Sequence, residues 1–411
     1  MLRLQRNNKF SKRIAFASKI CYTWIDIIIE RNDIPYREQT IMTKKIRSSN
    51  IEFYRIAMML IIIAHHLVVN SGVVASYDYQ NITGNMIFLQ LFGFGGKPMI
   101  DGFLLITGFF SVKSKFTVEK ALRVFLEIFF YKVGFYLLFG LIGFHKLTSE
   151  GLFGAVFYVF RSADGAFPAT YFWLYCLTPF INKMALNLTK RQFQGLLAVL
   201  LTYFTIISTA FRKIDTFSEL GWYITAYLIG SYLQLHEPRI LNKCWKSGLL
   251  TLAALVACYG SILLLTYGRA NGTTELDIYY YVSNAHKPLG LLLAVTSFQW
   301  FRHMKLPNSR VINTVASSIF GVLLIHANSN TMRTKLWKDW LDIRGHYDWE
   351  WLPLYAIIAV ICIFLICTAM DQVRIHLLEK PFFKLYRIIE AKVKKRFVRA
   401  KSITVSEVSE P

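Results

Sequence analysis

Several hallmarks of soluble enzymes and of energy-driven transporters are missing from this sequence. Only 18% of its 411 residues are charged, whereas a soluble globular domain is about 25% charged. Its six cysteines form no CxxC motif and no cluster with histidine, which predicts neither a disulfide framework nor a metal site. The sequence also lacks a Walker motif, a GxSxG elbow and an HExxH motif. ATP-driven transport, serine hydrolase and zinc protease functions therefore have no support.

Apolar residues dominate what is present. They make up 54% of the chain, aromatic residues make up 16%, and the mean hydropathy is positive. Many apolar runs approach the roughly 20 residues that cross a bilayer. The sequence therefore predicts an all-α fold, a polytopic integral membrane helix bundle. The formal net charge of +22 lies mostly in short loops and in the segment from Arg374 to Lys401, which indicates a basic face beside anionic lipid and not a nucleic-acid-binding surface.

We expect about ten transmembrane helices, because the apolar runs of near-spanning length number about ten. They are predicted at residues 51–70, 96–112, 122–143, 170–186, 193–211, 217–235, 248–267, 285–301, 312–328 and 352–373. With the N-terminus inside, lysine and arginine gather in the inside loops, whereas the outside loops 71–95 and 268–284 contain only Arg269. The positive-inside rule therefore favours a multi-pass cell-membrane protein with both termini in the cytoplasm.

Two apolar segments between the predicted spans have other interpretations. Met86–Phe94 is too short to cross a membrane and is followed by glycines, so we predict a re-entrant or interfacial piece. Residues 144–169 are predicted to form a lid or an interfacial helix on the outside.

The two ends of the chain differ from the membrane domain that we expect at 42–390. Residues 1–41 form a basic extension without a small-residue cleavage site, so they are not a signal peptide. We expect translation to begin at Met42, which would leave 1–41 untranslated. The alternative is an interfacial amphipathic helix around Ile20–Ile29. Residues 391–411 are predicted to be a cytoplasmic tail, first basic and then polar, disordered at its end.

The first predicted span, Ile51–Ser71, is unusual because it carries ionisable residues within an apolar run. Arg55 and His66 are eleven positions apart, which places them about 20° from each other around an α-helix and about 16 Å apart along it. His65 lies roughly 80° away from their face. Ionisable groups inside a span are costly and usually functional, although Arg55 alone could extend to the headgroups and His66 alone could be a hydrogen-bonded core residue.

Further polar residues strengthen the functional interpretation. Asp101 lies near the outer end of the second predicted span, and His326 lies at the outer end of the ninth. His326 as a single feature could simply cap the bundle. Arg55, His66 and Asp101 together are less easily explained as accidents.

Six segments resemble, in order, the bacterial acyltransferase-3 family, which includes O-acetylases of surface polysaccharides. The first is NIEFYRIAMMLIIIAHHLVVN (Asn50–Asn70), and the family's hallmark is an arginine and a histidine with ten residues between them. The others are GGKPMIDGFLLITGFF, TYFWLYCLTPFIN, ELGWYITAYLIGSYL, SIFGVLLIHAN and MDQVRIHLLEKPFFK. The resemblance covers about residues 45–390.

This resemblance implies transfer of an acyl group, most often acetyl, from cytoplasmic acyl-CoA to a hydroxyl of a cell-surface or lipid-linked glycan. Acetyl-CoA is the expected donor. The resemblance assigns Arg55, Lys120 and Arg123 to the CoA phosphates, through charge-assisted hydrogen bonds. Where many members have a paired arginine, RxxR, this chain has Lys120-Ala-Leu-Arg123, and lysine cannot form the bidentate fork of arginine.

The resemblance also suggests catalytic roles for three residues. A sugar hydroxyl needs a base that works near neutral pH, and we expect His66 to be that base or to carry the acyl group itself. Asp101 is expected to orient or polarise an imidazole. His326 occupies the family's late histidine position, with Leu323 and Leu324 where a tyrosine is more usual nearby.

A transporter or flippase for a lipid-linked sugar or a small organic acid is the alternative. Arg55 and His66 would then line its pathway. The sequence shows no internal repeat, which counts modestly against this alternative, and a structural membrane scaffold ranks third. Dependence on acetyl-CoA would separate the candidates, because a transporter moves its substrate unmodified.

Overall fold

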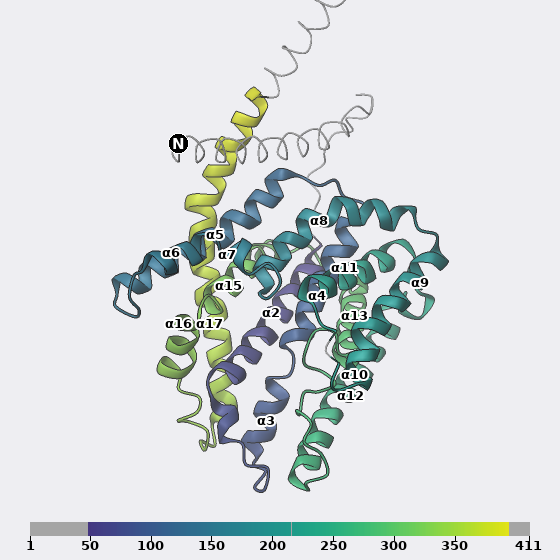
Figure 1. Cartoon of the computed structure of the whole chain (residues 1–411), viewed down its shortest axis with the longest axis vertical. Helices are drawn as coiled ribbons and strands as arrows, with labels where there is room; N and C mark the ends of the chain where they lie inside the picture. Colours follow the sequence, from purple (N-terminus) through teal and green to yellow (C-terminus); the bar gives the residue numbers. More distant parts are fainter. Residues whose placement is uncertain (1–47, 215, 394–411) are drawn as a thin grey trace, which may run out of the picture. The chain divides into compact units, whose positions relative to one another are not determined.

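The computed structural model describes residues 48–214 and 216–393, and all regular structure within them is helical (Figure 1). The all-α prediction is confirmed. The predicted extension 1–41, the predicted start at Met42 and nearly all of the predicted tail 391–411 lie outside the described residues.

Each of the ten ranges predicted to cross a membrane contains helix. These helices are α2 (Ser49–Asn70), α4 (Gly96–Ser111), α5 (Val118–Leu141), α8 (Phe167–Asn187), α9 (Lys190–Leu201) with η3 (Thr202–Ile207) and α10 (Ser208–Ala210), α11 (Glu219–Leu235), α12 (Cys244–Ala270), α13 (Pro288–His303), α14 (Arg310–Ala316) with α15 (Ile319–His326), and α17 (Leu352–Arg374).

The number of membrane spans is a separate question. Five of the described helices are long and apolar enough to cross a membrane: α2, α5, α12, the stretch Lys190–Ala210 and the long helix Leu352–Val393. A sixth is added if Arg310–His326 and Asn330–Trp340, which are bent by 91°, form one broken span. The predicted number of ten is therefore not confirmed. Helices α4, α11 and α13 have only 16 or 17 residues, fewer than the roughly 20 that span a hydrocarbon core.

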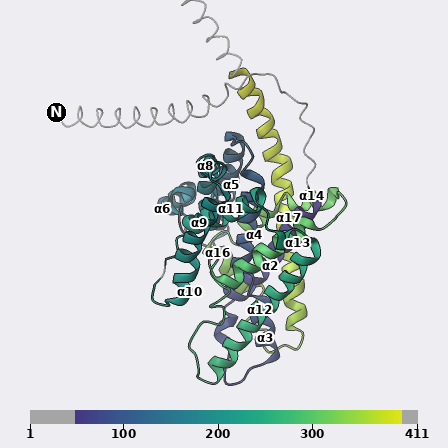
Figure 2. The same cartoon turned by 90° about the vertical axis from the view of Figure 1, so that its right-hand side faces the viewer.

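Helix α2 lies among several others. It packs against α4, α13, α14, α15 and α17 (Figures 1 and 2). Although α2 is one of the five apolar helices, its buried residues include polar ones near its start, such as Asn50 and Glu52. The first predicted span is thus a packed interior helix, as expected for a helix that carries ionisable residues.

Helix α4 packs against α2 and makes a close crossing with α11. A Cβ atom on Gly108 would lie 2.0 Å from the carbonyl oxygen of Tyr227, and one on Gly230 would lie 2.3 Å from that of Leu105. Such small residues let two backbones approach closely inside a membrane bundle. The position of α4 relative to α11 is therefore fixed by backbone contact.

Short helices connect the longer ones. Met86–Phe94 largely forms α3 (Gly84–Phe92), which is too short to cross a membrane. The predicted lid segment 144–169 contains α6 (Ser149–Val156) and α7 (Tyr158–Arg161). Beyond α15, the chain forms α16 (Asn330–Arg333) and the π-helical turn η5 (Thr334–Trp340). A second π-helical turn, η6 (Ile375–Glu379), continues α17, and in both views this long helix extends beyond its neighbours (Figures 1 and 2).

Candidate active site

Two of the predicted catalytic residues meet at the ends of α2 and α15. His66 Nδ1 lies 3.0 Å from His326 Nε2, although 260 positions separate the two residues in the chain. His326 is fully buried, and its Nδ1 lies 2.6 Å from the backbone oxygen of Val322. The structure therefore brings His66 and His326 together as a hydrogen-bonded pair.

The contacts of this pair assign the protons on both rings. A carbonyl oxygen only accepts hydrogen bonds, so His326 Nδ1 must carry a proton and, in the neutral ring, His326 Nε2 must accept. His66 Nδ1 then donates to His326 Nε2. The hydrogen-bond network thus places the basic lone pair of His66 on Nε2.

A cavity of about 190 Å³ lies beside the pair. It is lined by His65 and His66 of α2 and by four charged residues from other elements, Lys97, Lys132, Glu219 and Arg333. A second cavity of about 500 Å³ adjoins it. The two share the lining residues Lys132, Tyr158, Gly165, Ala166, Ala327 and Arg333. The predicted lid segment 144–169 contributes to both walls.

The cationic side chains of this cavity have different partners. Lys97 Nζ lies 3.6 Å from Glu219 Oε1. The amine of Lys132 donates to the backbone oxygen of Asn328 and lies 4.0 Å from the centre of the Tyr158 ring. Arg333 Nη1 lies 3.4 Å from Asn330 Oδ1. Burial raises the pKa of the Tyr158 hydroxyl to about 12, so this group remains protonated at neutral pH.

His65 has a different environment from His66. Its Nδ1 lies 2.6 Å from the backbone oxygen of Gly93. A Cβ atom on Gly96 would lie 2.2 Å from its ring atom Cδ2, so the ring packs directly on the backbone of the glycine-rich entry to α4. The two adjacent histidines are therefore unequal: His66 pairs with His326, and His65 bonds to a loop.

Asp101 lies fully buried in α4, where its Oδ1 accepts a hydrogen bond from Trp222 Nε1 at 2.8 Å. Its Oδ2 has no hydrogen-bond partner among the described residues. Asp101 does not line the cavity beside the histidine pair, and its hydrogen-bond partner is the Trp222 indole. Its predicted role in orienting an imidazole remains a prediction.

The three residues assigned to CoA phosphates lie in two places. Arg55 Nη1 lies 3.3 Å from Glu52 Oε2, near the opposite end of α2 from His66. Lys120 is exposed near the start of α5. Arg123 forms ion pairs with Glu379 and, at 3.1 Å, with Glu119. Among the described residues, no ion pair or hydrogen bond joins Arg55 to Arg123, and their shared role in donor binding remains a prediction.

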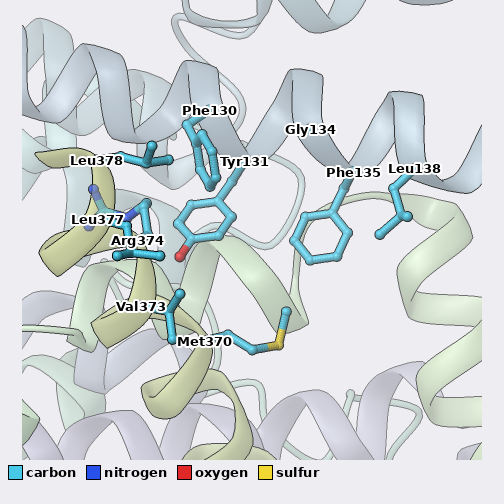
Figure 3. A pocket seen from close by; sticks show the side chains of 10 residues that line it. All are labelled: Phe130, Tyr131, Gly134, Phe135, Leu138, Met370, Val373, Arg374, Leu377 and Leu378. Atoms are coloured by element: carbon cyan, nitrogen blue, oxygen red, sulfur yellow. The ribbon is translucent and has the colours of Figure 1, made fainter.

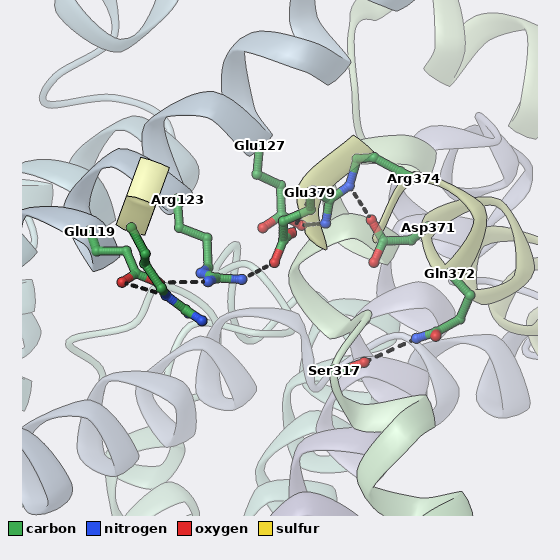
Figure 4. A network of polar contacts seen from close by, with 9 residues as sticks. Glu119, Arg123, Glu127, Ser317, Asp371, Gln372, Arg374 and Glu379 are labelled. Atoms are coloured by element: carbon green, nitrogen blue, oxygen red, sulfur yellow. Dashed lines mark hydrogen bonds and ion pairs between the residues drawn. The ribbon is translucent and has the colours of Figure 1, made fainter. Parts of the chain in front are cut away.

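The sequence analysis missed a buried ion network between α5 and α17. Arg374 bonds to Asp371 at 2.7 Å, to Glu127 at 2.9 Å and to Glu379 at 2.7 Å (Figure 4). Tyr131 also donates to Asp371 Oδ1 at 2.7 Å. Two signals in the sequence could have identified this network: Glu127 lies within an apolar run, and Asp371 lies three residues before Arg374.

Lys132 and Arg333 were also missed as lining residues. Lys132 is a charged residue in the middle of α5, which is a signal by itself. Arg333 follows a predicted span, and no periodic pattern indicates that its side chain borders the site.

An apolar groove runs beside the ion network. It has a volume of about 380 Å³ and is lined by Phe130, Phe135, Met370, Val373 and other side chains of α5 and the α17 helix, with Arg374 among them (Figure 3). A second groove of about 450 Å³ shares Phe130, Gly134, Arg374 and Leu378 with it. In a membrane, such a surface is suited to hydrocarbon chains.

Helices of spanning length are typical of a multi-pass membrane protein, and the candidate site in this one is a hydrogen-bonded histidine pair beside a cationic cavity. The family model of the acyltransferase domain, in the acyltransferase-3 family, matches residues 49–370. The chain belongs to this family and is a membrane acyltransferase. No curated protein and no solved structure matched in the corresponding comparisons. The matched region contains both histidines of the pair and ends just before Asp371.

Proposed function

We propose that this acyltransferase moves an acyl group, acetyl in the first instance, from cytoplasmic acyl-CoA to a hydroxyl of a cell-surface or lipid-linked glycan. The observation that carries the proposal is the hydrogen bond between His66 and His326 beside a polar cavity. A half-buried histidine at a cavity, whose basic nitrogen is set by a second, buried histidine, is suited to general base catalysis.

In the proposed reaction, His66 Nε2 takes the proton of the acceptor hydroxyl as the hydroxyl oxygen attacks the thioester carbonyl carbon. The carbon–sulfur bond then breaks, and the proton passes from His66 to the departing CoA sulfur. His326 supports the positive charge on His66 by accepting from its Nδ1. In a two-step variant, His66 Nε2 attacks the thioester carbonyl carbon first, the carbon–sulfur bond breaks and CoA leaves as its thiolate. The acceptor hydroxyl oxygen then attacks the acyl-histidine, the carbon–nitrogen bond breaks, and the hydroxyl proton passes to the CoA sulfur.

The donor is proposed to enter from the cytoplasmic side. Arg55 lies eleven residues before His66 on one helix, about 16 Å along its axis. The long pantetheine arm of CoA could connect phosphates near Arg55 with a thioester near His66. Arg123 already pairs with two carboxylates, so a CoA phosphate would have to compete for it. This supports Arg55 as the stronger candidate and leaves Lys120 and Arg123 as secondary contacts.

The acceptor is proposed to enter from the outside, in an orientation with both termini in the cytoplasm. The distribution of lysine and arginine over the loops supports this orientation. The cavities beside the histidine pair are lined by the segment around Tyr158 and by Arg333. Tyr158 lies in the predicted outer segment 144–169, and Arg333 follows the span predicted to end on the outside at residue 328.

The experiment compares cell-wall and capsular glycans by proton NMR from cells with and without the protein. Loss of an O-acyl signal, restored by the wild-type chain but not by His66→Ala at equal protein level, is the expected result. Purified protein in nanodiscs should also transfer radiolabelled acetyl from acetyl-CoA to the isolated glycan. Unchanged glycans, together with passage of an unmodified sugar across vesicle membranes, would establish the transporter alternative instead.

A further inference from the structure

The two cavities beside the histidine pair carry an excess of positive charge. Their charged lining residues, histidines aside, are Lys97, Lys132, Arg333 and Glu219. Three cations and one carboxylate leave a balance of +2. Glu219 lies beside Lys97, so the uncompensated charges belong to Lys132 and Arg333, for which the described residues supply only neutral partners.

These two cations lie on one wall. The amine of Lys132 bonds to the backbone oxygen of Asn328, and Arg333 bonds to the side chain of Asn330, two residues further on. Two like charges in a partly desolvated cavity repel each other, and an anion between them removes that cost. Lysine offers a compact charge, and arginine offers a planar fork that matches phosphate or carboxylate.

The place of this wall indicates which substrate would supply the anion. Asn328 lies two residues after His326, and Lys132 and Arg333 line the same cavity as His66. Lys132 belongs to the span predicted at 122–143, and Arg333 follows the span predicted to end on the outside at residue 328, whereas the donor phosphates are expected near Arg55 at the other end of α2. A negative group held here therefore belongs to the acceptor.

We propose that the acceptor is an acidic glycan, whose phosphate or carboxylate is held by Lys132 and Arg333 while one of its hydroxyls reaches His66. This inference rests on the proposed function, because it treats the cavity as the acceptor site. It narrows the substrate class from glycans in general to those with a negative charge close to the acylated hydroxyl.

Binding to the full-length protein in nanodiscs tests the proposal without requiring turnover. The probes are tetragalacturonate, its fully methyl-esterified form and a phosphodiester-linked disaccharide, with acetyl-CoA as a fourth ligand. The variants are Arg333→Gln and Lys132→Gln with Arg333→Gln. The control is Arg344→Gln, which removes the same charge from an exposed residue that does not line either cavity.

The wild-type protein should bind at least one charged probe about tenfold or more tightly than the methyl ester, in line with charge-assisted hydrogen bonds. The double variant should lose this preference, Arg333→Gln should lose part of it, and Arg344→Gln should retain it. Higher salt should reduce the preference of the wild-type protein for the charged probe. The tighter of the two charged probes identifies carboxylate or phosphate. Because Arg333 is exposed, its single variant should fold even if the double variant does not.

Three results would overturn the proposal: equal affinity for the acid and its methyl ester, no detectable binding of either charged probe, or a weaker affinity for acetyl-CoA in Arg333→Gln with glycan binding unchanged. Failure of the proposed function looks different. Charge-selective binding would then persist, but wild-type protein would transfer no acetyl group. His66→Ala should abolish transfer while keeping the charge preference.

Discussion

Glu127 Oε1 of α5 lies 2.9 Å from Arg374 Nη2 of the α17 helix, and this ion pair joins segments that are 247 positions apart in the chain. Both side chains are almost completely buried. Removing one partner from a buried pair leaves the other charge uncompensated, which is usually more costly than never having had the pair.

Arg374→Ala should therefore destabilise the protein strongly. It would leave Glu127, Asp371 and Glu379 close together without their shared cation. We expect a loss of about 3–5 kcal/mol in the free energy of unfolding, measured by SDS titration in mixed micelles. Arg387→Ala is the matched control, because Arg387 pairs with Glu119 on the surface with a largely exposed side chain. It should leave unfolding unchanged within error, and equal effects of both variants would refute the interpretation.

The two adjacent histidines should respond differently to substitution. His66→Ala removes the proposed base and should reduce acyl transfer about 10²–10⁴-fold, whereas His65→Ala should cause a smaller loss because His65 bonds to the Gly93 carbonyl. Initial rates with acetyl-CoA and the isolated glycan, at matched protein levels, would measure both. Equal losses from the two variants would contradict the assignment of His66 as the base.

The role of His326 can be separated from its bulk. His326 accepts from His66 Nδ1, and the side-chain oxygen of glutamine can also accept a hydrogen bond. His326→Gln should therefore retain more activity than His326→Ala, with the difference mainly in kcat. A matched melting temperature for both variants would show that the comparison concerns the hydrogen bond. If His326→Gln is as inactive as His326→Ala, His326 does more than accept a hydrogen bond from His66.

The close packing of His65 on Gly96 gives a steric prediction. A methyl group on Gly96 would meet the His65 ring at 2.2 Å, whereas one on Gly260 would meet nothing within 4 Å. Gly96→Ala should lower both the melting temperature and the transfer rate, and Gly260→Ala should change neither. Adding His65→Ala to Gly96→Ala should restore part of the lost stability, because the smaller side chain makes room. No restoration would show that the strain lies elsewhere.

The positions of the helices could be predicted from the sequence because apolar runs of near-spanning length are a strong signal. All ten predicted ranges contain helix. Their membrane-crossing status could not be predicted as well, since α4 and α11 are short and mostly packed against each other. Apolarity alone does not distinguish a helix that faces lipid from one that is buried in protein.

The site could be predicted only in part, for a physical reason. His66 stood out because a titratable residue inside an apolar run is costly, and the family resemblance pointed to His326. Their hydrogen bond depends on how α15 packs against α2, which the sequence does not encode in any local pattern. The same is true of Arg333, which reaches the cavity only because the chain bends after α15.

That bend has a consequence for the selection of substrates. The chain turns by 91° between His326 and Asn330, and Asn328 lies within the turn, holding the Lys132 amine through its backbone oxygen. Asn328 is itself held by the backbone oxygens of Tyr131 and Leu324. His326, the partner of the proposed base, and the Lys132 amine are thus held at the same turn of the chain. In the proposed reaction this turn fixes the distance between the acylated hydroxyl and the negative charge of the acceptor. That distance in turn determines which hydroxyl of a sugar is acylated.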